Sequence, residues 1–233
     1  MPAALPVPDA PVVSVTEAIA RMEAIEAALP AADGLACFNR MYLDVTRQVN
    51  SQLGQGFFAD PAFMTQLDVT FANLYFAAAD VAGDPAAVPL AWRPLAERRA
   101  LPGIEPIQFA LAGMNAHINH DLALAVLQTN ADLNIVPAAD GPEHADYFAV
   151  NTLLDEVSPA AIAMLAEDPL GELAEDTGKV GRLLAAFDIR AARAVAWDFA
   201  CQLRDLPSVA RDAALAAQDV TTGAVGRTLL TAV

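Results

Sequence analysis

Basic residues are scarce in this chain of 233 residues. The sequence contains 13 lysines and arginines but 29 aspartates and glutamates, which gives a formal net charge of −16 with neutral histidines. Nucleic acids and anionic membranes bind proteins through clustered basic side chains that displace counterions. Because the sequence has no basic stripe, we expect no nucleic-acid or membrane partner. The surplus of carboxylates predicts a solvated acidic surface.

Cysteines and long apolar runs are also scarce. The two cysteines, Cys37 and Cys201, lie far apart within helical patterns, which favours buried thiols over a disulfide framework or a Cys-x-x-Cys metal site. Every stretch of about 18 residues is interrupted by a charged residue or a proline, so we expect no membrane span. The first residues lack a basic segment and are rich in proline, unlike a signal peptide. We therefore expect a soluble, cytoplasmic protein whose residues 1–12 form a flexible tail.

Strand patterns are missing, whereas helix signals are frequent. No segment alternates polar and apolar residues with β-branched enrichment. Ser14 to Glu17 reads as a capping box, and Asp60-Pro61 reads as an N-cap followed by the first helical residue. These signals predict one all-α domain over residues 13–233, a bundle of about seven to nine helices. The expected helices span approximately 15–29, 33–53, 61–80, 94–100 (short), 106–128, 143–157, 159–166, 180–206 and 208 to near the end, with connecting loops at 130–142 and in the acidic stretch 167–178.

Polar side chains gather in one short stretch, GMNAHINHDL, at residues 113–122. It contains two of the three histidines, two asparagines and an aspartate, in a chain dominated by alanine and aliphatic residues. The stretch lies inside the helix expected over 106–128. A step of 100° per residue places His117, His120 and Asp121 in one sector, away from the apolar stripe. The two histidines and the aspartate are therefore expected to share a surface.

The spacing within this stretch favours a binding site. His117 and His120 are three residues apart, and His117 and Asp121 are four apart, so their side chains are neighbours on a helix. Imidazole nitrogens and a carboxylate suit zinc, manganese or iron. The small residues Ala110 and Gly113 leave space beside them. That space would hold a ligand or let another helix cross closely.

The helix expected after the loop carries a second polar face. His144, Phe148, Asn151 and Asp155 recur at helical spacing, with Tyr147 at the margin of the same face. The connecting loop is short enough for the two helices to pack antiparallel. Such packing would bring all three histidines into one interior cluster.

The leading hypothesis is a metal-dependent enzyme of hydrolase or lyase type that acts on a small, weakly polar molecule. Its metal ligands would be His117, His120, Asp121 and His144, with His117, Asp121 and His144 as the catalytic residues and an open position for water or substrate. The expected ligand-binding residues around this centre are Asn115, Asn119, Tyr147, Asn151 and Asp155.

Two alternatives remain open. One is a metal-free cyclase or isomerase of secondary metabolism, in which His117 is a general base oriented by Asp121. The other is a non-enzymatic binding or structural protein, in which the same side chains form a hydrogen-bonded contact between helices. The sequence lacks the His-Glu-x-x-His motif of zinc hydrolases, a phosphate-binding Gly-x-x-x-x-Gly-Lys loop and a Gly-x-Ser-x-Gly elbow, so those enzyme classes are not supported.

The quoted stretch resembles a motif of an uncharacterised, mainly actinobacterial family that is known only as a domain of unknown function. That family shows Gly-Met-Asn-x-His-Ile-Asn-x-Asp-Leu, which GMNAHINHDL matches, and the resemblance extends to FNRMYLDVT at 38–46 and LDVTFANLY at 67–75. The resemblance implies that His117, Asn119 and Asp121 are the polar members of the motif. It places His120 at an open position, and it implies no particular activity.

Overall fold

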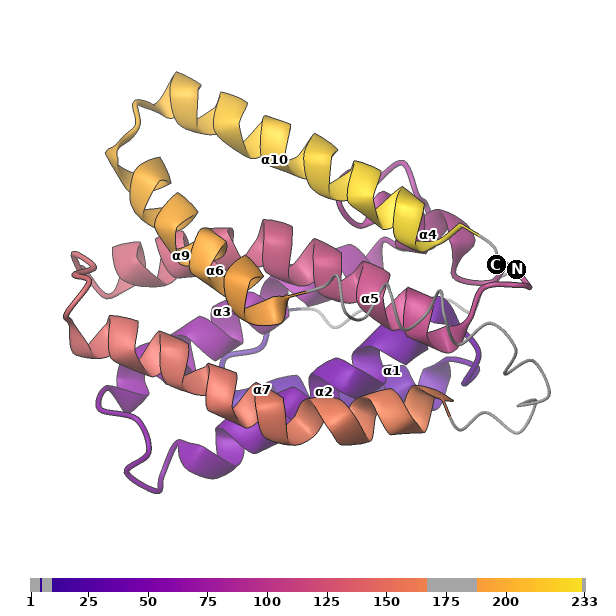
Figure 1. Cartoon of the computed structure of the whole chain (residues 1–233), viewed down its shortest axis with the longest axis horizontal. Coiled ribbons are helices and arrows are strands. Elements are labelled where there is room, and N and C mark those ends of the chain that lie inside the picture. The colour runs from indigo at the N-terminus through magenta and orange to yellow at the C-terminus, as the bar shows by residue number, and fades with distance from the viewer. Residues whose placement is uncertain (1–4, 6–9, 167–187, 232–233) are drawn as a thin grey trace.

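The computed structural model describes residues 5, 10–166 and 188–231, with side chains along the seventh helix described as far as Glu156. All regular elements in these residues are helices, which confirms the all-α prediction (Figure 1). With α5, η1 and α6 counted as one continuous helix, the described residues contain eight helices, which is within the expected number. The elements are α1 (Val15–Ala28), α2 (Gly34–Gln52), α3 (Pro61–Asp80), α4 (Arg93–Arg98), α5 (Pro106–Ala116), the π-helix η1 (His117–Asp121), α6 (Leu122–Asp132), α7 (Pro142–Ala166), α9 (Ile189–Asp205) and α10 (Ser208–Leu229).

Local capping signals set where the first three helices begin. The Ser14 side chain accepts a hydrogen bond from the backbone of Glu17 at 3.2 Å. Asp33 caps α2 through Leu35, and Asp60 caps α3 through the backbone nitrogens of the residues that follow Pro61. Each cap satisfies backbone donors that have no partner inside the helix. The predicted starts of these helices are therefore confirmed.

Two predicted boundaries are wrong. Residues 142–166 form one helix, α7, instead of two helices divided before Pro159. A Ser-Pro pair often begins a helix, because proline lacks a backbone donor and suits the first turn, but here the helix continues through it. The helix that begins at Pro106 continues to Asp132, beyond the predicted end, and contains the π-helical turn η1. The acidic stretch 167–178 and the first residues of the helix expected over 180–206 lie outside the described residues.

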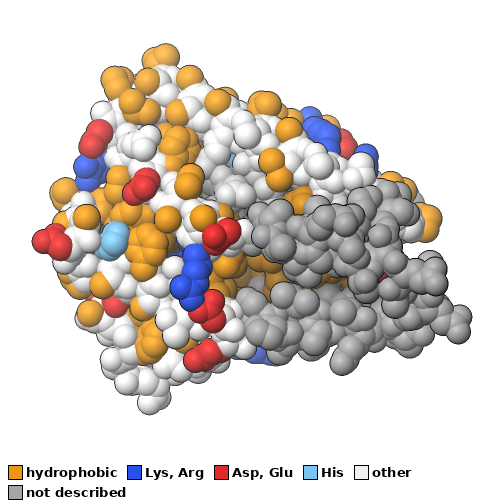
Figure 2. Space-filling model, viewed as in Figure 1, with side chains coloured by type: hydrophobic (Ala, Val, Ile, Leu, Met, Phe, Trp, Pro, Cys, Tyr) orange, Lys and Arg blue, Asp and Glu red, His pale blue; other side chains and the backbone are white. Residues whose placement is uncertain are grey.

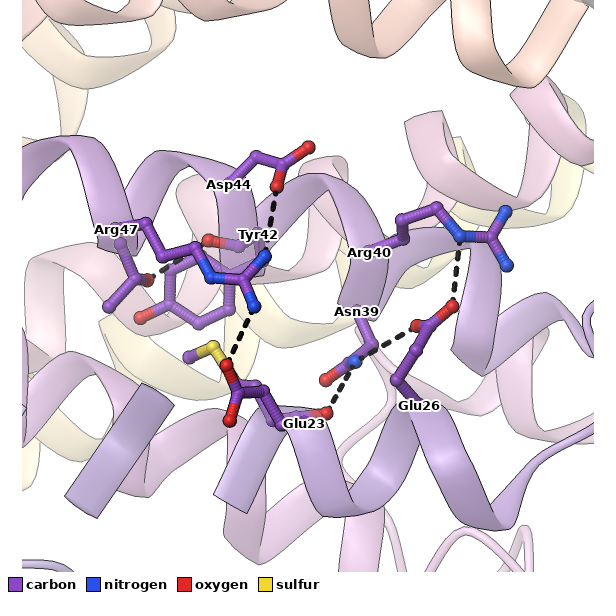
Figure 3. Close-up of polar contacts among 9 residues, drawn as sticks. Glu23, Glu26, Asn39, Arg40, Tyr42, Asp44 and Arg47 are labelled. Carbon is purple, nitrogen blue, oxygen red and sulfur yellow. Dashed lines mark hydrogen bonds and ion pairs between the residues drawn. The ribbon is translucent and has the colours of Figure 1, made fainter. Parts of the chain in front are cut away.

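Ion pairs join the surfaces of α1 and α2 (Figure 3). Arg40 Nε lies 2.9 Å from Glu26 Oε1, and Arg47 Nη2 lies 2.6 Å from Glu23 Oε1. Deeper in the interface, Asn39 donates to the backbone oxygen of Met22 and accepts from the Tyr75 hydroxyl. Arg40, Arg47 and Asn39 of α2 therefore take part in helix packing.

The buried hydrophobic side chains of the described residues form two adjoining groups. One lies between α1, α2, α3 and α5, and the other between α3, α6, α7 and α9. Val12 is also buried, and its backbone forms two hydrogen bonds with the side chain of Asn73 on α3. The end of the expected N-terminal tail is thus anchored to the bundle. On the face seen in Figure 2, charged side chains are scattered singly or in small groups among exposed hydrophobic ones.

Gly113 is where α5 crosses α2 closely. A Cβ atom at this position would lie 2.3 Å from Cγ of Phe38, whose ring is buried among other aromatic side chains. Of the two roles considered for the space beside the histidines, close helix crossing is the one that the structure shows at Gly113.

Replacing Gly113 by alanine should therefore destabilise the protein. Alanine favours a helix over glycine by about 1 kcal/mol, but overpacking against a fixed ring costs about 1–3 kcal/mol. We expect a net loss in the free energy of unfolding, measured by chemical denaturation. Gly83→Ala is the matched control, because a Cβ at Gly83 meets nothing within 4 Å. Equal stability of the two variants would contradict the close crossing.

Candidate functional site

The polar stretch lies on a π-helical turn. Between α5 and α6, residues His117–Asp121 form η1, and the backbone nitrogen of Leu122 bonds to the carbonyl oxygen of His117, five residues earlier. A single π turn inside an α-helix is uncommon and often occurs at a functional site. The turn changes the angular spacing of side chains, so a projection at 100° per residue does not hold here. His117, His120 and Asp121 are all buried.

Asp121 is the hub of this turn. Its carboxylate accepts hydrogen bonds from His117 Nδ1 at 2.9 Å, from His120 Nδ1 at 2.7 Å and from the indole Nε1 of Trp92 at 3.0 Å. A carboxylate without a proton only accepts, so both imidazoles present their Nδ1 hydrogens to it. The predicted link between His117 and Asp121 is present, and Trp92 adds a third donor from the proline-rich loop.

The charges of the three groups differ. Burial raises the pKa of Asp121, but hydrogen bonds from His117 and His120 outweigh it and hold the pKa below its usual value. Burial lowers the pKa of His117, and the opposing effect of Asp121 does not restore it. Burial also lowers the pKa of His120, but Asp121 and Asp219 together raise it above its usual value. The arrangement therefore favours a charged Asp121–His120 pair beside a neutral His117.

His117 is held in an aromatic cage. Its ring stacks on Phe71, with 3.5 Å between centroids and 5° between planes, and the Tyr42 ring contacts it edge-on at 4.5 Å. Its Nε2 has no hydrogen-bond partner among the described residues. Because Nδ1 carries the hydrogen that binds Asp121, Nε2 of the neutral ring is an acceptor.

His117 lines an apolar cavity of about 120 Å³. One water needs about 10–15 Å³ of such space, so the cavity is large enough for a small ligand. Tyr42 and Asp68 also line it, and neither the Tyr42 hydroxyl nor Asp68 Oδ2 has a hydrogen-bond partner in the described part of the chain. The remaining lining comes from α2, α3, α5, η1, α6, α7 and α9: Phe38, Met41, Val45, Val49, Met64, Leu67, Phe71, Met114, Ile118, Leu122, Val150, Leu154, Ile189 and Arg193.

Asp68 is a carboxyl group that this cavity keeps away from water. It lies on α3, one turn before Phe71, and burial raises its pKa to about 7. A carboxyl group with such a pKa is largely protonated in slightly acidic solution and can donate a hydrogen bond. The cavity wall therefore offers a basic nitrogen and an acidic proton.

The raised pKa of Asp68 predicts a pH-dependent stability. In the unfolded chain this carboxyl ionises near pH 4, whereas in the folded protein it ionises at about pH 7. The contribution of the protonated carboxyl to the free energy of unfolding is therefore complete below pH 4 and is lost as the pH rises to about 7. Asp68→Asn should stabilise the protein at pH 8, by at most about 4 kcal/mol at 1.4 kcal/mol per pKa unit. Thermal melts of both proteins between pH 4 and 8 measure this, and an unchanged difference across that range would contradict it.

His120 lies away from the cavity. Its Nε2 is 3.6 Å from Asp219 on α10, and Asp219 in turn accepts hydrogen bonds from the backbone nitrogens of Leu90 and Ala91. His120 thus links η1 to α10 and to the loop that carries Trp92. His117 and His120 share Asp121 but only His117 is among the cavity residues.

Of the two asparagines of the stretch, Asn115 joins this helix to α10, and Asn119 supports Asn115. Asn115 donates to the backbone oxygen of Thr222 on α10 at 2.9 Å and accepts from Asn119 at 3.1 Å. Neither asparagine lines the cavity. Their recorded contacts are those of helix packing, and their predicted role in ligand binding stays a prediction.

The residues predicted from the second polar face lie around α9. The His144 ring contacts Phe148 and Trp197, with centroid distances of 4.6 and 5.3 Å. Tyr147 donates to the backbone oxygen of Arg193 at 2.6 Å, Asn151 accepts from Arg193 Nε at 2.8 Å, and Asp155 pairs with Arg190. Of the predicted face, Tyr147 and Asn151 approach the cavity through Arg193.

Metal binding stays a prediction. Over the described ranges, no group of three or more His, Cys, Asp or Glu side chains is placed to hold an ion. The predicted ligands His117, His120 and Asp121 instead bond to one another, and the recorded ring contacts of His144 are aromatic.

Asp68 and Arg193 were not predicted as site residues. Asp68 shares a helical face with Met64, Ala72 and Tyr75, at offsets of four and seven, and all of them are buried. A carboxylate within such an apolar face was the available signal. Arg193 offered a similar signal on α9, where the nearby Ala196, Trp197 and Ala200 are buried.

Comparisons with known proteins agree with the resemblance seen in the motif. Residues 15–232 match the family of unknown function DUF5995. No curated protein and no solved structure matches the chain. Among the described residues, no helix is long and apolar enough to cross a membrane. Because the match covers nearly the whole sequence, the chain belongs to the DUF5995 family of unknown function.

Proposed function

We propose that the protein is a metal-free enzyme that catalyses proton transfer on a small, largely apolar molecule, of isomerase or cyclase type. One observation carries the proposal: His117 lines an apolar cavity and has a buried, unpartnered Nε2, while Asp121 holds its Nδ1. A general base needs a lone pair directed at the substrate and a partner that fixes the ring.

The second polar group supplies the acid. Asp68 on α3 and Tyr42 on α2 both line the cavity, and Asp68 Oδ2 and the Tyr42 hydroxyl lack a partner among the described residues. The pKa of Tyr42 is raised first by burial and then by the charges of Asp68 and Asp121, as expected for a hydroxyl near both carboxyls. A protonated carboxyl or a phenol stabilises a developing enolate by donating a hydrogen bond to its oxygen.

These roles define a reaction. His117 Nε2 removes a proton from the carbon beside a carbonyl group, and the electron pair of that C–H bond moves toward the carbonyl oxygen, which Asp68 or Tyr42 stabilises. The imidazolium that forms is stabilised by Asp121 and returns its proton at another carbon of the enolate system. In a cyclase, the enolate carbon instead bonds to a second carbonyl carbon of the same molecule, and the alkoxide formed there takes the proton. The apolar lining excludes water from the enolate and favours substrates with a hydrocarbon body.

Deuterium exchange tests this proposal without a known substrate. Apolar enolisable ketones are incubated with tag-free protein in D₂O, and loss of the α-proton signal is followed by NMR. We expect the wild type to accelerate exchange of at least one ketone, and His117→Gln to reduce that rate by about a hundredfold or more. Gln128→Ala is the control on the same continuous helix, since its exposed side chain bonds to Asp132 and does not line the cavity. Exchange that is equal in wild type and His117→Gln would contradict the proposal.

Metal content separates this proposal from the metal-dependent hydrolase or lyase predicted from the histidine spacing. Elemental mass spectrometry is applied to tag-free wild type and to folded His117→Ala. We expect far less than one equivalent of zinc, manganese or iron in both proteins. Near-stoichiometric metal in the wild type that is lost in the variant would replace the metal-free mechanism by metal-assisted chemistry at the same turn.

A further inference from the structure

A buried arginine borders the cavity of His117. Arg193 on α9 is only 6% exposed. Its Nε donates to Asn151 Oδ1 at 2.8 Å, its Nη2 donates to the backbone oxygen of Tyr147 at 2.5 Å, and the guanidinium lies 4.4 Å from the centre of the Tyr147 ring. These partners orient the guanidinium, but none of them carries a formal charge.

The positive charge of Arg193 has no counter-ion in the described part of the chain. The other well-buried arginine, Arg99, has Asp33 within 2.9 Å, whereas no carboxylate lies within ion-pair distance of Arg193 among the described residues. Burial lowers the pKa of Arg193, and Tyr147 opposes this effect. Arginine stays protonated even so, and a buried charge without a partner is unfavourable. An anionic group of a ligand would supply the missing partner.

The cavity separates this charge from His117. Helix α7 runs antiparallel to α2: Glu156 contacts Gln48, whereas Asp146 binds the backbone beyond the end of α2, at Ala59. The two α7 partners of Arg193 lie before Glu156, so Arg193 is near the C-terminal end of α2. His117 packs instead on Tyr42. Six residues of helix separate Tyr42 from Gln48, which corresponds to roughly 9 Å.

The wall between the two polar ends is apolar. Methionine, leucine, isoleucine and valine side chains from α2, α3, η1, α6 and α7 form it. A ligand that satisfies the whole cavity therefore has an anionic group at one end and a hydrocarbon body. A carboxylate matches the planar fork of the guanidinium best.

We propose that the cavity binds an apolar monocarboxylate, with the carboxylate on Arg193 and the hydrocarbon body extending toward His117. The placement of a reacting carbon beside His117 rests on the proposed function, whereas recognition of the carboxylate rests on Arg193 alone. Asp68 is the acidic residue among the described cavity residues, and it lies on α3. Arg193 Nε and Nη2 bond to Asn151 and Tyr147 and not to Asp68.

Calorimetric binding of decanoate and decanol to the full chain tests this inference. The two molecules share one hydrocarbon chain and differ in the charged group. We expect the wild type to bind decanoate at least about tenfold more tightly than decanol, the effect of one charge-assisted bidentate contact. Arg193→Met should abolish this preference. Arg190→Met should retain it, because Arg190 lies one turn earlier on α9 and pairs with Asp155 at the surface.

Circular dichroism and thermal melts show whether each variant is folded. If Arg193→Met does not fold, Arg193→Lys takes its place, because lysine keeps the charge without the bidentate fork and should show a reduced preference. Equal binding of the two ligands by the wild type, binding of neither, or a preference that survives in folded Arg193→Met would overturn the inference. The proposed function fails separately from this inference: a wild type that binds decanoate with the expected preference but accelerates proton exchange of no ketone keeps the carboxylate site and rejects proton transfer.

Discussion

Asp121→Ala is expected to lower the free energy of unfolding by about 3–5 kcal/mol, the usual cost of removing one member of a buried charged pair. Asp121 accepts three hydrogen bonds, from His117, His120 and Trp92, and its side chain is 3% exposed. Alanine leaves all three donors without a partner, and each unsatisfied buried donor adds a desolvation cost. It also leaves the charge of His120 without its closest carboxylate.

Urea denaturation of wild type and Asp121→Ala measures this change. Asp121→Asn is the informative second variant, because the amide keeps the shape and one acceptor oxygen but cannot accept from all three donors. We expect the free energy of unfolding of Asp121→Asn to lie between those of the wild type and Asp121→Ala. A loss below about 1 kcal/mol for Asp121→Ala, the range of a single ordinary hydrogen bond, would contradict the role of this carboxylate as the hub.

Asp33→Ala is expected to cost a similar amount for a different reason. Arg99 Nε lies 2.9 Å from both carboxylate oxygens of Asp33, and their side chains are 3% and 5% exposed, respectively. Asp33 also caps α2 through the backbone nitrogen of Leu35 at 2.9 Å. Removing the carboxylate leaves a buried, uncompensated guanidinium, which costs about 3–5 kcal/mol, and the lost cap adds about 1 kcal/mol.

An exposed ion pair provides the control for this prediction. Glu23 and Arg47 are about half exposed and join α1 to α2 at 2.6 Å (Figure 3). Glu23→Ala should change the free energy of unfolding by less than about 1 kcal/mol, because water and salt screen exposed pairs. Chemical denaturation of the two variants under one buffer measures the contrast. Similar effects for Asp33→Ala and Glu23→Ala would show that the Asp33–Arg99 pair is not buried as described.

Features that depend on neighbouring residues could be predicted from the sequence. The apolar spacing gave the all-α class, and side chains such as Ser14, Asp33 and Asp60 marked helix starts because a cap acts within a few residues. The contact between His117 and Asp121 followed from their separation of four residues. The wrong division of α7 came from a local Ser-Pro signal, which often begins a helix but lies here within one continuous helix.

Features that depend on how helices cross could not be predicted in this way. The cavity needs α2, α3 and α7 to pack around η1, so nothing near Asp68 or Arg193 in the sequence pairs them with His117. The π turn itself changes which residues face inward, and no residue type in GMNAHINHDL distinguishes a π turn from an ordinary α-helical turn. His144 lies at helical spacing with Asn151, yet its ring packs on Trp197, a partner from α9.

The protonation state of the His117 imidazole tests the proposed chemistry most directly, and the chain has only three histidines to assign. Nitrogen-15 NMR of histidine-labelled protein, recorded between pH 5 and 8, reports which ring nitrogen carries the proton. We predict that His117 is neutral at pH 7, with hydrogen on Nδ1 and a bare Nε2 whose signal shifts when a ligand fills the cavity. A His117 that carries hydrogen on Nε2 at pH 7, in either the charged or the opposite neutral form, would contradict it.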